Sequence, residues 1–280
     1  MIMKKFLIQF AVFLFASISI GHAQTSNPVT KDDANAYQVL SMLAFLPDET
    51  VLDINNKSTR LFDEKFNRAE TMIEQAQKGN RVHQAILGIA YYSGSIKQLP
   101  ISYDQAEYWF RKSADQGFEP SFYHLAELIY CRKPKTQKNV ALVIEYLNKA
   151  NNFPLAILTQ ADSQIDKKNI TTSEIVQIRN KLLKLKLDSK GGEYLWGLFA
   201  EIQSPDVDIT LARIYNKLGD NESAEKLLIS ALDIKTLTFP IEVSSSSSST
   251  IERYQYLVRA LRAVQSKKQI PNPRQSFYCD

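Results

Sequence analysis

Three stretches of this chain share one pattern, in which two alanines seven to nine residues apart are followed by glycine or asparagine. They run over residues 69–79, 106–117 and 141–152, and their leading alanines lie 37 and then 35 residues apart. A second pattern, a bulky and a small residue followed by another bulky one, alternates with the first at 87–91 and 125–129, and returns at 211–215. Self-similarity at such a period is typical of helical repeat proteins. The sequence therefore predicts an all-α fold built from helix–turn–helix units.

The small residues of these patterns predict close packing between the two helices of a unit. Alanines at helical spacing let two helices approach, while leucine and aromatic side chains fill the space between them. Gly88 lies inside a helical pattern, where glycine costs about 1 kcal/mol relative to alanine. We therefore expect a neighbouring helix to lie close to Gly88. The residues that end the three stretches, Gly79, Gly117 and Asn152, suit the left-handed conformation of a helix C-cap.

One copy of the pattern resembles the Sel1-like repeat, a variant of the tetratricopeptide repeat. The resemblance depends on Leu87, Gly88, Tyr91 and Gly94, followed by Tyr103, Ala106, Trp109, Phe110, Lys112, Ala114, Gln116 and Gly117. Residues 60–79 look like the second half of an earlier copy, 120–152 like a degraded copy, and 209–233 like a plain tetratricopeptide unit. Residues 154–204 keep helical periodicity but depart from the pattern. The resemblance implies an α-solenoid of Sel1-like and tetratricopeptide-like helix pairs, closed by capping helices, that acts as an adaptor in multiprotein assemblies.

The first 23 residues have the pattern of a secretory signal peptide. Two lysines precede an apolar run over residues 6–20, and small residues fit a cleavage site after Ala23. A membrane span needs about 20 apolar residues, and this run is shorter. We therefore expect an exported protein in the periplasm of a Gram-negative-type bacterium. Cleavage leaves 32 basic and 30 acidic side chains, a net charge of +2. That charge gives no electrostatic footprint for nucleic acid, and the mature chain is expected to be soluble.

Three parts are expected in the mature chain. Residues 24–240 form the helical repeat domain, 241–250 a serine-rich linker, and 251–280 a C-terminal amphipathic helix and tail. An N-cap signature at 249–252 and an apolar stripe from Ile251 to Val264 predict this last helix. It either caps the last repeat or makes a peripheral contact with a partner or an anionic membrane through its apolar and basic residues.

The only two cysteines are Cys131 and Cys279. An even number of cysteines in an exported protein suggests a disulfide. A bridge between them would tie the end of the chain to its middle. Alternatively both are free thiols, with Cys131 a small apolar residue at the end of a helical pattern.

The sequence contains no recognisable catalytic, cofactor or metal motif. The two histidines of the mature chain, His83 and His124, occupy similar places in neighbouring repeats, but two imidazoles without a third ligand are a weak metal signal. A cell-wall hydrolase needs two carboxylates, and nothing selects a pair among the acidic candidates. These are Glu107, Glu127, Glu193, Glu201, Asp206 and Asp208. We therefore expect a protein that is not an enzyme and holds no cofactor.

Aromatic residues are crowded between positions 91 and 130. Most of them are expected to fill the repeat core, because helical repeats bury their cores between neighbouring units. The remainder would line a concave surface that receives a protein segment, where aromatic side chains act as anchors. The candidates for this partner-binding surface are Tyr92 and Tyr123, together with His83 and His124.

These features predict a periplasmic adaptor or scaffold that binds proteins of the cell envelope. By its resemblance, the chain would assemble or position an envelope complex, such as a secretion system. One alternative is a peptidoglycan-binding accessory protein or hydrolase with a polar pocket around Glu127 or Glu201. Another is a secreted factor that acts on a host. The partner and the oligomeric state stay open at this point.

Overall fold

The computed structural model describes residues 28–44, 51–54, 57–60, 68–190, 204–232 and 247–271. The predicted signal peptide, Glu193, Glu201 and Cys279 lie outside these residues. The chain divides into two compact units, Met1–Phe153 (unit 1) and Pro154–Asp280 (unit 2). Each unit is described by itself.

Unit 1 is helical, with one short hairpin. Its described helices are α2 (Lys31–Ala44), α3 (Arg68–Gln77), α4 (Arg81–Ser93), α5 (Tyr103–Ala114), α6 (Glu119–Arg132) and α7 (Gln137–Lys149). From α3 to α7, each helix packs against the next one along the chain. The antiparallel hairpin of β1 (Val51–Ile54) and β2 (Lys57–Arg60), with Val51 opposite Arg60, was not predicted. The all-α class is confirmed, and that hairpin is the exception among the residues of this unit that the structure describes.

Helix ends in unit 1 follow the expected chemistry at most positions. Gly79 and Gly117 have φ values of 89° and 75°, so both adopt the left-handed conformation predicted for them. Asn152 does not adopt it. At the other ends, α4, α5 and α7 begin after Asn80, Ser102 and Thr136. Each of these three side chains accepts a hydrogen bond from a backbone N–H of the first turn.

Gly88 marks the closest approach of α4 and α5. A Cβ atom built on Gly88 would lie 2.5 Å from two ring carbons of Phe110, which is closer than carbon atoms pack. Phe110 itself is 1% exposed. The glycine is therefore needed for the packing of these two helices, as the sequence predicted.

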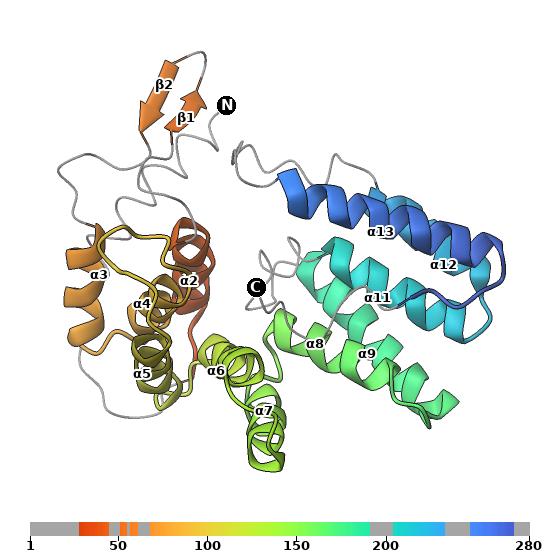
Figure 1. Cartoon of the computed structure of the whole chain (residues 1–280), viewed down its shortest axis with the longest axis horizontal. Coiled ribbons are helices and arrows are strands. Elements are labelled where there is room, and N and C mark those ends of the chain that lie inside the picture. The colour runs from red at the N-terminus through yellow and green to blue at the C-terminus, as the bar shows by residue number, and fades with distance from the viewer. Residues whose placement is uncertain are drawn as a thin grey trace. The chain divides into compact units, whose positions relative to one another are not determined.

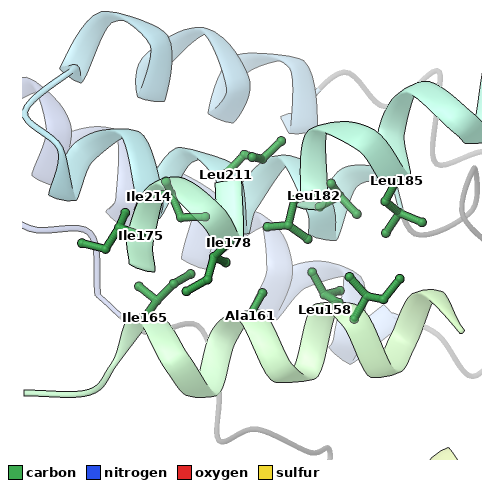
Figure 2. Close-up of a cluster of buried hydrophobic side chains, with 11 residues drawn as sticks. Leu158, Ala161, Ile165, Ile175, Ile178, Leu182, Leu185, Leu211 and Ile214 are labelled. Atoms are coloured by element: carbon green, nitrogen blue, oxygen red, sulfur yellow. The ribbon is translucent and has the colours of Figure 1, made fainter. Parts of the chain in front are cut away.

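Unit 2 contains α8 (Pro154–Ile165), α9 (Thr172–Lys190), α11 (Ser204–Lys217), α12 (Asn221–Leu232) and α13 (Ser247–Gln265). Figure 2 shows aliphatic side chains of α8, α9 and α11 pointing toward one another in one buried cluster, with Leu182 and Leu211 fully buried. A second cluster joins α11 and α12 to α13 through Leu228, Leu257 and Ala260. The helical periodicity predicted for residues 154–204 is thus present in α8 and α9.

The C-terminal helix differs from its prediction in extent, and its burial agrees with the capping alternative. It begins at Ser247, so the last four residues of the expected linker 241–250 are helical, and 241–246 lie outside the described residues. Its apolar residues Tyr256, Leu257 and Val264 are buried in unit 2. The helix therefore covers α12 and does not present these side chains to a membrane. None of the described helices has the length and apolar character needed to span a membrane.

Candidate functional site

A chain of three polar side chains joins α2 to α6 in the interior of unit 1. The Tyr37 hydroxyl lies 2.7 Å from Nε2 of His124, and Nδ1 of the same ring lies 3.1 Å from Oε2 of Glu127. Tyr37 is 1% exposed and His124 9% exposed. Since Glu127 and His124 are three residues apart on one helix, their side chains meet on the same face. Tyr37 comes from α2 and precedes His124 by 87 positions in the sequence.

Aromatic rings enclose this polar chain. The ring centroid of Tyr37 lies 5.4 Å from that of Phe118 and 6.0 Å from that of Phe153, both in edge-to-face contact. The imidazole of His124 stacks on Phe110 with 5.0 Å between centroids and 15° between planes. Such pairs add to the stability gained from burial alone. Phe118, His124 and Phe153 therefore form an aromatic box around Tyr37, made by α6, the residue before it and the residues that follow α7.

The order hydroxyl, imidazole, carboxylate is the order of a hydrolase triad. In a triad, however, the hydroxyl must reach a substrate, and Tyr37 is enclosed. Burial raises the pKa of Tyr37 well above its ordinary value, and the charge of Glu127 acts in the same direction. A phenol held neutral in this way is a poor nucleophile. The arrangement therefore fits a structural tie between α2 and α6 rather than a reacting centre.

A second group of side chains surrounds the guanidinium of Arg132 at the end of α6. The guanidinium lies 4.6 Å from the ring centroid of Tyr103 and 5.7 Å from that of Tyr92. The two tyrosine rings contact each other edge to face, at 5.6 Å. Burial raises the pKa of Tyr92, and Glu127 adds to the shift. This cluster combines a cation with aromatic faces and joins α4, α5 and α6.

The four residues predicted to line a partner-binding surface are placed differently from that expectation. His83, Tyr123 and His124 are 1%, 5% and 9% exposed, so in this structure they do not line an open surface. Tyr123 packs against Phe153 and His124. Tyr92 is half-buried and belongs to the cluster around Arg132. The physical reason is that α4 and α6 have helices on more than one side, so residues on both faces are buried.

His83 is a buried histidine without a hydrogen-bond partner at either ring nitrogen. Burial lowers the pKa of His83 to about 4, so the ring is neutral at pH 7. The ring contacts of His124 are with Tyr37, Phe110 and Tyr123. The two histidines thus do not act as a pair, and the described residues contain no group of three or more metal-ligating side chains.

Unit 2 has an interior polar cluster that sequence analysis missed. Arg213 of α11 is 4% exposed and forms ion pairs with Asp162 of α8 at 2.6 Å and with Asp166, the residue after the end of α8, at 2.5 Å. Thr210 donates a further hydrogen bond to Asp162 at 3.1 Å. Burial raises the pKa of Asp162 to about 6. The negative charges of Asp166 and Asp206 raise this pKa further, whereas the positive charge of Arg213 lowers it. The four-residue spacing of Asp162 and Asp166 was the available signal, since it corresponds to about one helical turn, although Asp166 lies just after the end of α8.

The acidic candidates that the structure describes are engaged in ion pairs or lie at a helix start. Glu107 pairs with Arg111 and Lys133 on the outside of unit 1. Asp208 is buried and pairs with Lys186 of α9. Asp206 lies in the first turn of α11, where an acid favours the positive helix end. Glu127 is held by His124, so the described acids do not form the open pair that a hydrolase needs.

The predicted disulfide between Cys131 and Cys279 stays a prediction. Cys131 lies near the end of α6, and Cys279 is outside the described residues.

Comparison of the chain with protein-family models, with curated proteins and with solved structures gave no match.

Proposed function

We propose that this chain is an exported, non-enzymatic adaptor that binds a protein of the bacterial envelope and helps to assemble or position an envelope complex, such as a secretion system. The supporting observation is the arrangement of unit 1, in which each helix from α3 to α7 packs against the next. Arrays of this kind bury a continuous core between neighbours and present an extended surface to a partner. The Sel1-like residues between 87 and 117 agree with this proposal.

Exposed apolar side chains on α7 mark the part of this surface where binding can be tested. Val140 and Ile144 lie one helical turn apart and are 48% and 56% exposed, while Val143 and Leu147 of the same helix are buried. Large apolar side chains that remain exposed next to each other are a feature of protein-binding surfaces. The envelope location is supported by the signal-peptide pattern of residues 1–23.

A photo-crosslinking residue at position 144 of the tagged, full-length chain tests the proposal in cells. We expect covalent capture of one envelope protein, identified by mass spectrometry. The matched control places the same crosslinker at Glu145, which is exposed on the adjacent helical position and paired with Lys149. Capture at both positions alike, or at neither, contradicts binding through this face.

A second measurement tests export. Fractionation of the same cells, followed by mass spectrometry of the mature N-terminus, should find the protein in the periplasm with Gln24 as its first residue. An uncleaved chain in the cytoplasmic fraction would contradict the proposed location. Retention of the purified chain on peptidoglycan without a protein partner would instead support the cell-wall alternative.

A further inference from the structure

Helix α2 does not follow the packing order of unit 1. The helices from α3 to α7 each pack against their successor, but α2 packs chiefly against α4 rather than against α3, the next described helix. Through Tyr37 it also reaches His124 of α6. Figure 1 shows α4 with α3 on one side and α2 on the other. The helix thus crosses two members of the array, as a bound helix does, rather than continuing it.

The contact face of α2 has the spacing of a helix bound in a groove. Its buried residues include Ala34, Tyr37, Leu40 and Ala44, all at most 1% exposed. These positions recur at intervals of three and four residues, the anchor pattern of amphipathic helices that dock on other proteins. The central anchor is a tyrosine in an aromatic box, and tyrosine in an enclosed pocket is typical of binding hot spots. The box itself is made without any residue of α2, from Phe118, His124 and Phe153.

The polar contacts of α2 also resemble those of an interface. At its start, Asp33 pairs with Arg81 of α4 at 2.6 Å, and in its middle the Tyr37 hydroxyl meets His124. Two further buried polar side chains, Gln38 and Ser41, bond to backbone carbonyls of α2 itself. The first turn is closed by reciprocal hydrogen bonds between Thr30 and Asp33. The helix therefore supplies its own N-terminal cap, while at its other end the Ala44 carbonyl accepts a hydrogen bond from the Ser95 hydroxyl outside the helix.

We propose that α2 is an internal ligand, which occupies a groove on α4 and α6 and gives way there to an amphipathic helix of a partner protein. The competing helix would carry an acid, a tyrosine and a leucine at positions i, i+4 and i+7, matching Asp33, Tyr37 and Leu40. Arg81 recognises the acid and the aromatic box recognises the tyrosine. This proposal rests on the proposed adaptor function only for the existence of a partner, and the groove is testable without one.

The test uses the full-length chain and a fluorescent synthetic peptide with residues 28–44 of its own sequence. In the variant Leu40→Asp, a charge at a fully buried position of α2 loosens the resident helix. We expect fluorescence anisotropy to show at least tenfold tighter peptide binding to this variant than to the wild-type chain. The matched control, Asn35→Asp, adds the same charge at an exposed position of α2 and should behave like the wild type. A peptide with Tyr37→Ala should bind the Leu40→Asp chain at least tenfold more weakly.

Hydrogen exchange on the same proteins shows how to interpret an absence of peptide binding. We expect the amides of α2 in the wild-type chain to exchange through an opening that leaves α4, α5 and α6 protected. Exchange of α2 only together with those helices, or loss of protection throughout unit 1 in Leu40→Asp, would show that α2 is an integral part of the fold and overturn the proposal. A Leu40→Asp chain that keeps α4 to α6 protected but binds no peptide would overturn it as well. These expected results do not depend on the crosslinking at position 144, so a failure of that experiment would not affect them.

Discussion

The two units fill their interiors with different side chains. In unit 1 the largest fully buried residues include Tyr37, whose ring contacts Phe118 and Phe153, and Phe110, whose ring stacks on His124. The core cluster of unit 2 in Figure 2 consists of isoleucine, leucine, valine and alanine. Aromatic rings bring directional contacts and, in tyrosine and histidine, polar atoms that need partners. Unit 1 thus has its polar groups within its aromatic core, whereas unit 2 keeps them in a separate ionic cluster on α8 and α11.

This difference gives the units opposite responses to acid. In unit 1, His83 is buried as a neutral ring and the pKa of Asp33 is lowered, because Arg81 and Thr30 outweigh the cost of burying its carboxylate. Both groups must take up protons when the pH falls, and the unfolded chain binds those protons more readily. In unit 2, the raised pKa of Asp162 means that the folded state binds the proton more readily. A fall from pH 7 to pH 5 therefore weakens unit 1 through His83 and strengthens unit 2 through Asp162.

The largest single effect is expected at Arg213. The substitution Arg213→Met should lower the free energy of unfolding of unit 2 by about 3 kcal/mol at pH 7, because it removes both ion pairs of a buried guanidinium and leaves the half-buried Asp162 without its cation. Urea unfolding followed by circular dichroism measures the change. The control Lys226→Met removes a fully exposed ion pair with Glu222 and should change little. Equal losses in the two variants would show that burial of the cluster is unimportant.

The acid response of unit 1 should depend on His83. The pKa of His83 is about 4 in the folded chain and about 6.5 when unfolded, so the unfolded state binds more protons between these values. Stability is lost as the pH falls through this window, by about 3 kcal/mol in full. His83→Leu should make the urea midpoint of unit 1 nearly independent of pH between 6.5 and 4. If the urea midpoint of unit 1 still depends on pH after this substitution, groups other than His83 cause the acid response.

Gly88→Ala tests the contact that holds α4 to α5. The added methyl group would meet Phe110 at 2.5 Å, and overpacking of this kind costs about 1–3 kcal/mol, more than the gain of about 1 kcal/mol in helix propensity. We therefore expect net destabilisation in thermal unfolding. In a Phe110→Leu background the same change should be less harmful, which a double-mutant cycle detects. Additive effects would mean that the two residues do not contact each other as described.

The smallest effect is expected at the tie between α2 and α6. Tyr37→Phe keeps the ring in its aromatic box but removes the hydroxyl that meets His124, at a cost of about 1 kcal/mol. Chemical denaturation of unit 1 measures the difference. Tyr108→Phe is the control, because that ring is 48% exposed. If Tyr108→Phe lowers the free energy of unfolding as much as Tyr37→Phe does, the buried hydroxyl of Tyr37 has no special role in stability.

The sequence was sufficient to predict the helices and their turns. Alanine spacing and the glycines that follow located α3 and α5, and the positive φ values of Gly79 and Gly117 agree with the expected C-caps. Gly88 was correctly interpreted as a close approach between helices. These features depend on local chemistry, which a sequence carries directly.

What the sequence did not predict depends on how helices surround one another. Residues 82–90 of α4 are all buried, so its two faces cannot be distinguished by polarity, and His83 is in the interior rather than in a groove. The contact of Tyr37 with His124 spans 87 positions and follows from the unusual place of α2. Arg213 lies within an apolar stretch whose burial depends on α8. Periodicity shows which residues share a face, but not what covers that face.

The most direct test of the opposite acid responses is methyl NMR of the full-length chain in a urea series at pH 7 and pH 5. Buried methyl groups of Ile86 and Leu125 report on unit 1, and those of Ile178 and Leu211 report on unit 2. We expect the lower pH to move the urea midpoint of unit 1 down and that of unit 2 up, and Asp162→Asn to abolish the rise. A fall of both midpoints together would contradict this expectation.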